Sequence, residues 1–229
     1  MALDFVPGEM KNGWWKIVGV VLVLYTLVAG FLFPVPKMDI LNETIRNVYF
    51  HVPIWFAMMT LMGISAFNSM RHLQKSDVKT DIYANEAAHA GIVFSILGIL
   101  TGSFWARYTW GTWWTTDTKL NGVAITFLIY MAYFVLRGSM PDEQKRARVS
   151  AIYNIFAFVM MIVFVMILPR MSASLHPGNG GNPAFGKYDM DNTMRTVFYP
   201  ACVGWILIGI WVFQIRVRIE KIKRKLLYD

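Results

Sequence analysis

Six long apolar runs constrain the fold of this chain more than any other feature of its sequence. Each is long enough to cross a bilayer, and together they cover about residues 14–33, 48–70, 84–106, 120–137, 149–168 and 196–215. A helix needs about 20 apolar residues to cross the hydrocarbon core, where every backbone amide must find its partner within the segment. The sequence therefore predicts an all-α integral membrane protein with six transmembrane helices in a single domain, residues 1–229.

The composition agrees with a membrane-embedded chain. Charged residues make up 16% of the 229 residues and hydrophobic residues 56%, whereas about a quarter of a soluble domain is charged. The net charge of +8 would suggest nucleic acid for a soluble protein. Here the basic residues lie between apolar runs, so we expect no nucleic-acid partner. The one cysteine, Cys202, lies in an apolar run, and neither an intrachain disulfide nor a CxxCH haem-attachment site is expected.

The positions of Lys and Arg predict the orientation of the spans. Most of the 22 basic residues lie in the two termini and in the connections after the second and fourth spans. Because basic residues accumulate on the cytoplasmic side, we expect both termini in the cytoplasm and the other three connections in the periplasm. The first run lacks the pattern of a removable signal peptide and is expected to remain a span. The basic tail after residue 215 could bind a partner, but anchoring the last span is its ordinary role.

The third connection contains a cluster of tryptophans in the sequence WARYTWGTWWTTDTKLN, residues 105–121. Four of the nine tryptophans fall within ten residues there: Trp105, Trp110, Trp113 and Trp114. Tryptophans also form belts at bilayer interfaces, but a belt needs fewer at each helix end. We therefore favour a platform for a flat ligand. If the loop is helical, the last three share one face at i, i+3, i+4 spacing.

Two histidines fall on the same outer side as this cluster. His51 lies at the start of the second span and His176 in the fifth connection. A single histidine near an interface is usually a structural hydrogen-bonding residue, but two beside an aromatic platform can approach opposite faces of one plane. Haem is a flat ring whose iron binds imidazole and whose propionates pair with Arg or Lys. This chemistry favours haem as the ligand.

The other two histidines fall on the inner side. We expect His72 to be solvated. His89 follows Glu86 by three residues, and this pair could be a simple hydrogen bond or part of an ion or proton route.

The tryptophan segment WGTWWTTDTKL resembles the WWD signature of haem-handling proteins in c-type cytochrome maturation. RNVYFHVPIWF, TGSFWARYTWGTWW and SASLHPGNG resemble further segments of the CcmC-type haem exporter family, which is related to CcsA and CcmF. The order of these segments and the number of spans agree over nearly the whole chain. Two departures stand out: Thr116 replaces an expected tryptophan, and Lys119 replaces the usual arginine.

The resemblance implies a site for haem b with His51 and His176 as the axial ligands. It implies a haem platform of tryptophans and one carboxylate: Trp105, Trp110, Trp113, Trp114 and Asp117. Basic residues are expected near the propionates: Arg46, Arg107 and Lys119. The segment before His176 matches the family less well than the others.

The resemblance also implies partners and a location. In the family, haem passes to the periplasmic haem chaperone CcmE, and the ABC-type complex CcmAB with the small membrane subunit CcmD completes the system. We expect a multi-pass protein of the bacterial inner membrane that handles haem rather than catalysing a reaction. The chain has no P-loop, so any use of ATP belongs to a partner. The Gly178–Gly181 stretch predicts a mobile loop around His176.

Three alternatives remain open at this point. A b-type electron-transfer protein would use histidines paired within the bilayer, and here the outer two lie at the water boundary. A transmembrane haem transporter would need an inner site, and only Glu86 and His89 suggest one. A larger WWD protein of another maturation system would have more spans than this chain.

Overall fold

The computed structural model describes residues 13–37, 41–172, 174–176 and 190–228, and every regular element in these ranges is helical. In chain order the elements are α1 Trp14–Leu32, η1 Asn42–Asn47, α2 Val48–Lys75, α3 Val78–Trp110, α4 Thr118–Gly138, α5 Glu143–Ile162, η2 Val163–Ile167, α6 Leu168–Met171 and α7 Asn192–Tyr228. The stretch Gly178–Gly181 lies outside the described residues.

The prediction of six membrane-spanning helices is confirmed. Six helical segments of the described chain are long and apolar enough to cross a bilayer. Several extend beyond the apolar runs: α3 begins at Val78 rather than at residue 84, and α7 continues past residue 215 to Tyr228. These additional turns are amphipathic or charged, so hydropathy does not detect them, although the helix continues through the interface.

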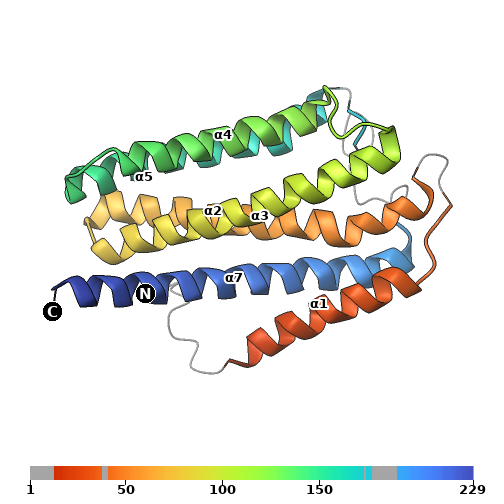
Figure 1. The fold of residues 1–229 in the computed structure, drawn as a ribbon, viewed down its shortest axis with the longest axis horizontal. Coiled ribbons are helices and arrows are strands. Elements are labelled where there is room, and N and C mark those ends of the chain that lie inside the picture. Colours follow the sequence, from red (N-terminus) through yellow and green to blue (C-terminus); the bar gives the residue numbers. More distant parts are fainter. Residues whose placement is uncertain (1–12, 38–40, 173, 177–189, 229) are drawn as a thin grey trace.

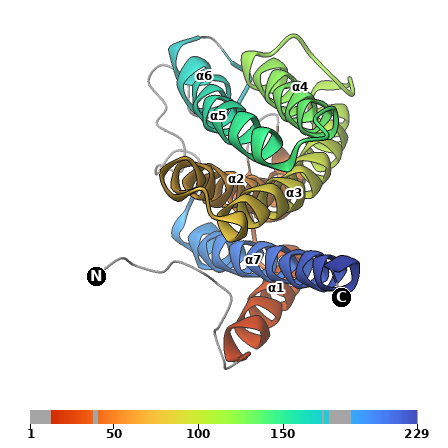
Figure 2. The ribbon, with the colours of Figure 1, turned by 90° about the vertical axis from the view of Figure 1, so that its left-hand side faces the viewer.

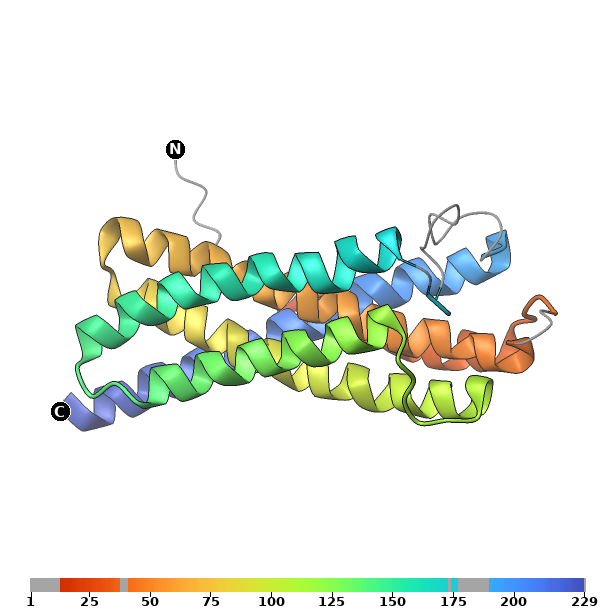
Figure 3. The ribbon, with the colours of Figure 1, turned by 90° about the horizontal axis from the view of Figure 1, so that it is seen from above.

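The helices lie nearly parallel to one long axis and stack in layers (Figure 1). Seen along that axis, α4 and α5 form one outer layer, α2 and α3 the middle layer, and α7 and α1 the other outer layer (Figure 2). Seen from above, α4 and α5 run side by side (Figure 3). α2 is the central helix, since it packs against α3, α5 and α7, and its Met58 and Leu61 are almost fully buried.

Two glycines allow α2 and α3 to approach closely. A Cβ added to Gly98 would lie 2.6 Å from the Trp55 ring, and one added to Gly102 would lie 2.7 Å from His51 Cε1. The spacing of these glycines is that of the small-xxx-small pattern through which membrane helices pack backbone to side chain. We call the gap left by each glycine a notch. The notches at Gly98 and Gly102 receive Trp55 and His51 of α2, so this packing sets the position of His51.

The second span begins where its apolar run begins, at Val48. α2 is preceded directly by the 3-10 helix η1. Pro53 therefore lies inside the helix, where its ring nitrogen cannot donate to the carbonyl of Tyr49. The residues of η1 are mostly polar, so hydropathy does not indicate the helical turn that leads into the apolar run.

The fifth span changes its helical form near its C-terminal end. α5 passes into the π-helix η2, which leads into α6 with Pro169 in its first turn. Pro169 cannot donate to the carbonyl four residues earlier, which favours a local change of helical winding. Gly122 of α4 packs directly against the backbone carbonyl of Phe164 in η2, so α4 supports this irregular turn.

Ion pairs hold the opposite end of the bundle together. Arg137 of α4 donates to both carboxylate oxygens of Asp81 in α3, at 2.8 and 2.6 Å. Arg216 of α7 lies 2.9 Å from Glu86 of α3. Both acidic side chains are buried, and removal of one partner from such a pair leaves an uncompensated charge. α3 is therefore tied to both outer layers at this end.

Candidate functional site

The predicted site residues gather at one end of the bundle. The α1–α2 and α3–α4 connections and the end of α6 all lie at the right of Figure 1. His51 lies near the start of α2 and His176 shortly after α6. The sequence expectation that the two histidines share one end of the bundle therefore agrees with the structure.

His51 has both ring nitrogens engaged. Nδ1 lies 2.9 Å from Oγ1 of Thr101, and Nε2 accepts a hydrogen bond of 3.1 Å from the indole Nε1–H of Trp55. Because indole can only donate, Nε2 carries no proton. The Thr101 hydroxyl donates to the carbonyl of Leu97 at 2.9 Å, so its oxygen accepts from Nδ1–H. The His51 tautomer is thus assigned from its neighbours, with the lone pair on Nε2.

Trp105 lies beside His51. The two rings meet edge to face, with their centroids 5.8 Å apart. The Trp105 indole donates to Oγ1 of Thr44 in η1 at 3.3 Å. The indole is therefore fixed between α3 and η1, with one edge against His51.

His176 is held by Asp117. Its Nδ1 lies 3.0 Å from Asp117 Oδ1, and the Asp117 side chain is only 1% exposed. Trp110 meets the His176 ring edge to face at a centroid distance of 5.0 Å. A carboxylate that accepts from one ring nitrogen fixes the ring and makes the other nitrogen a better donor to a metal.

Asp117 also organises the two segments that meet at His176. It is the N-cap of α4, and its Oδ1 accepts from the backbone N–H of Lys119 at 2.9 Å. Its Oδ2 accepts from Ser174 Oγ at 2.8 Å and from Leu175 N–H at 2.7 Å. Burial alone would raise the pKa of Asp117, but the hydrogen bonds from His176, Leu175 and Ser174 hold this pKa below its ordinary value. Asp117 is therefore a carboxylate at neutral pH.

The two histidines belong to one electrostatic environment. His176 and Lys119 both lie close enough to His51 for their charges to act on its imidazole. Lys119 is half-buried, and it lies in turn within range of Arg170 and Asp117. The structure thus brings together the imidazoles, Asp117 and one of the three predicted cations.

The other two predicted cations bind backbone carbonyls at this end. Arg46 donates to the carbonyls of Gly30 and Phe33 at 2.9 and 2.6 Å and to the carboxylate of Glu43 at 2.7 Å. It thereby joins the end of α1 to η1. Arg107 donates to the carbonyl of Gly111 and is otherwise exposed.

The tryptophan loop is not helical, so the expected face of Trp110, Trp113 and Trp114 does not form. α3 ends at Trp110 because Gly111 adopts a left-handed conformation, with φ of 77°, which glycine takes without a steric cost. Trp113 packs edge to face on Phe104 at 5.2 Å and remains 54% exposed.

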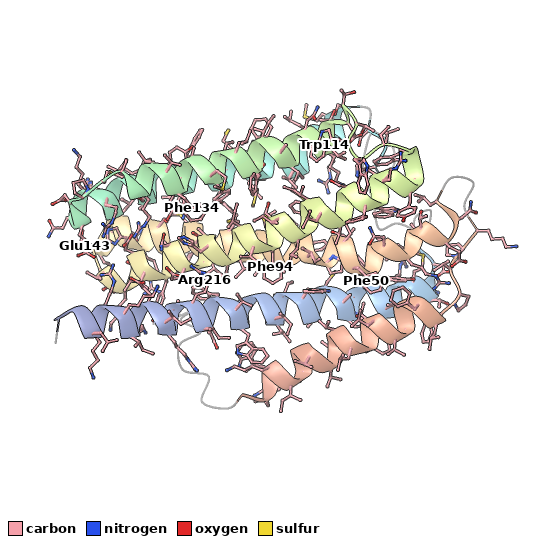
Figure 4. The ribbon with its side chains drawn as sticks, in the orientation of Figure 1. Phe50, Phe94, Trp114, Phe134, Glu143 and Arg216 are labelled. Carbon is pink, nitrogen blue, oxygen red and sulfur yellow. The ribbon has the colours of Figure 1, made fainter. Side chains whose placement is uncertain are left out.

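The Trp114 indole donates to Oδ1 of Asn121 at 3.3 Å, and the residue is 41% exposed. Figure 4 shows it beside the connection between α3 and α4. Thr116, which replaces an expected tryptophan, is exposed as well. The loop therefore presents an aromatic surface that the other described residues leave partly exposed.

Two site residues were missed by the sequence analysis. Trp55 follows His51 by four residues, so helical periodicity places it on the same face and could have identified it. Thr101 gave no signal, since it meets His51 only through the packing of α3 on α2.

The other two histidines, His72 and His89, have structural partners. His72 was expected to be solvated, but it is 7% exposed and its Nδ1 lies 3.0 Å from the carbonyl of Asp77. The turn between α2 and α3 folds over it. His89 Nδ1 lies 3.0 Å from the carbonyl of Asn85, while the Glu86 carboxylate pairs with Arg216. Figure 4 shows Arg216 in the half of the bundle away from Trp114.

Comparison with known proteins gives one consistent result. A family model described as "CcmC: Heme exporter protein C" matches residues 7–228. A protein of Paracoccus denitrificans named "Heme exporter protein C" is 25% identical over 93% of this chain and 87% of its own length. An Escherichia coli protein of the same name is 25% identical over 90% of this chain and 81% of its length. One from Bradyrhizobium diazoefficiens is 30% identical over 62% of this chain and 53% of its length.

Proposed function

This chain belongs to the haem exporter protein C family, and from that premise we propose that it holds haem between two axial histidines at the periplasmic membrane surface and delivers it to a periplasmic haem chaperone. Membership of the family gives the chain a role in haem handling for cytochrome c maturation. With six spans and bacterial relatives, it is a multi-pass protein of the bacterial inner membrane. We propose that residues 1–229 act as a single haem-handling unit.

The observation that carries this proposal is the arrangement of the two imidazoles. His51 lies near the start of α2 and His176 just after α6, at the same end of the bundle, and each has its Nδ1 engaged by an oxygen. Nε2 is therefore the nitrogen of each ring that an iron would use, and at His51 it becomes available when the Trp55 indole N–H moves away. Two imidazoles are a suitable axial pair for haem b.

Trp105 and Trp110 support this role because each packs against the edge of one histidine. We assign Trp113 and Trp114 to the exposed part of the platform, where they would cover the apolar ring. Asp117 contributes by holding His176 rather than by covering the haem. Its charge stabilises the imidazole that binds iron.

The propionates are assigned first to Lys119, whose ammonium group lies within electrostatic range of His51. Arg170, which sequence analysis did not select, lies within range of Lys119 and adds positive charge. Arg46 and Arg107 would have to exchange backbone carbonyls for carboxylates before they could contribute.

We assign transfer of haem to the chaperone CcmE, with CcmAB and CcmD as the further partners of the system. The exposed loop that follows α3 is the surface on which we place chaperone docking. The distribution of Lys and Arg supports an orientation with both termini in the cytoplasm and this loop in the periplasm.

The proposal is tested with purified protein from cells that are well supplied with haem. The wild type should show the absorption bands of a six-coordinate b-type haem, and its pyridine haemochrome should identify haem b. His51→Ala and His176→Ala should each lose most of the bound haem, and both should fail to load the chaperone. His89→Ala, at the inner end, is the matched control and should keep the wild-type spectrum.

A colourless wild-type protein, or His51→Ala and His176→Ala forms with unchanged spectra, would contradict the proposal. The control also addresses the transport alternative, because a haem supply that fails in His89→Ala would point to an inner site. Reduction of bound haem by quinol without transfer would favour the electron-transfer alternative.

A further inference from the structure

Trp55 occupies a defined position next to the proposed haem ligand. Its indole lies in the notch at Gly98, where an added Cβ would come within 2.6 Å of the ring. His51 occupies the next notch on α3, at Gly102. The two rings meet nearly at right angles, with centroids 6.0 Å apart. This packing aims the Trp55 N–H at Nε2 of His51, with a donor–acceptor distance of 3.1 Å.

An imidazole nitrogen without a proton has a single lone pair in the plane of the ring. In the structure this lone pair of His51 accepts the indole hydrogen bond. An iron bound at Nε2 would need the same lone pair. The hydrogen bond from Trp55 and the bond to iron therefore exclude each other.

We propose that Trp55 competes with haem iron for His51, so that haem binding displaces the indole N–H and haem release restores its hydrogen bond. This inference rests on the proposed function. The exchange transfers no electron and no proton: an Fe–N bond replaces an N–H···N bond, and the Nδ1 proton remains directed at Thr101. Trp55 lowers the cost of release, because the Nε2 lone pair regains a partner when iron leaves.

The two histidines differ in a way that makes His51 the ligand that leaves first. The Nδ1 of His176 is held by the carboxylate of Asp117, at 3.0 Å, which strengthens the ring as a metal ligand. The Nδ1 of His51 meets the neutral hydroxyl of Thr101 rather than a carboxylate. Trp55 is thus placed at the weaker of the two ligands, where competition has the larger effect on release.

The test compares the wild type with Trp55→Phe and Trp55→Leu, which both remove the N–H but differ in how they fill the notch at Gly98. Each purified protein is loaded with haem, and the loss of haem to excess apomyoglobin is timed. Both variants should bind haem about fivefold more tightly and lose it more slowly, since a neutral hydrogen bond is worth about that factor. Trp205→Phe, which alters an indole packed on Phe94 of the core, is the matched control.

A double variant separates competition from packing. In a His51→Ala background, Trp55→Phe should not change the weak residual haem affinity measured by titration, because the competition acts through Nε2 of His51. Haem loss in Trp55→Phe and Trp55→Leu that is equal to or faster than in the wild type would overturn the inference. If His51→Ala itself retained haem normally, the proposed function would fail instead.

Discussion

Asp117 performs two tasks with one carboxylate, since it caps α4 and holds the His176 ring. The sequence marked this residue as part of a haem platform through its resemblance to a family motif. It did not identify the hydrogen bond between Asp117 and His176, because the two positions are far apart in the chain and meet only where α4 begins. Thr101 was missed for the same reason, because its contact with His51 arises from the packing of α3 on α2. Trp55 lies one helical turn after His51, and periodicity could have identified it.

The two tasks of Asp117 can be separated by Asp117→Asn. Asparagine caps helices about as well as aspartate, so α4 should still begin at residue 118. Its amide nitrogen cannot accept the hydrogen bond from Leu175 N–H, so we expect a moderate loss of thermal stability as well. The neutral amide should weaken haem binding by about tenfold, which is within the range for partners of metal-bound histidines. The measurement is a haem titration together with a thermal melt in detergent.

Asp142→Asn provides the matched control, because Asp142 caps α5 in the same manner through Lys145 N–H. It should leave haem binding unchanged. If Asp117→Asn bound haem like the wild type, the carboxylate would have no part in holding the ligand.

Helical elements were predicted well by apolar length, whereas their ends and irregular turns were not. All six spans are present, because backbone hydrogen bonding in a bilayer leaves the helix as the form available to one apolar run. The 3-10 turn η1 and the π-helix η2 were not predicted. They depend on polar residues, Pro169 and tertiary contacts rather than on hydropathy. The left-handed conformation of Gly111 was not predicted either. It ends α3 at Trp110, so Trp110, Trp113 and Trp114 do not share one helical face.

Close packing of α2 on α3 leads to a prediction for Gly102→Ala. The added methyl group would lie 2.7 Å from His51 Cε1, so the imidazole must shift. We expect haem binding to fall at least fivefold and the free energy of unfolding to fall by about 1–3 kcal/mol, as is usual for overpacking. Haem titration and thermal melts measure both effects.

Gly138→Ala is the control at the level of the helix, since a Cβ there would meet no atom within 4 Å. It should bind haem normally. Unchanged haem binding in Gly102→Ala would show that the position of His51 does not depend on this notch.

The whole molecule is a stack of helix pairs with ion pairs at one end and the proposed haem site at the other (Figure 1). The predicted family is confirmed by the match over residues 7–228. The direction of the bundle in the membrane stays a prediction from the positions of Lys and Arg. The unequal distribution of Lys and Arg indicates this direction, whereas the packing of the helices against one another does not.

The orientation can be measured with single cysteines in a Cys202→Ala background. Thr116→Cys lies in the exposed tryptophan loop, and Ser139→Cys lies in the exposed turn after α4 at the opposite end. A membrane-impermeant maleimide applied from the periplasm should label the first in intact cells. It should label the second only after the inner membrane is opened, and the reverse pattern would contradict the assigned orientation.

The most direct test of the two-histidine site is electron paramagnetic resonance of the ferric haem in the purified protein. The account predicts a low-spin, six-coordinate signal in the wild type, and its replacement by a high-spin signal or loss of haem in both His51→Ala and His176→Ala. A low-spin signal that survives unchanged in either variant would contradict the claim that these two imidazoles hold the iron from opposite faces.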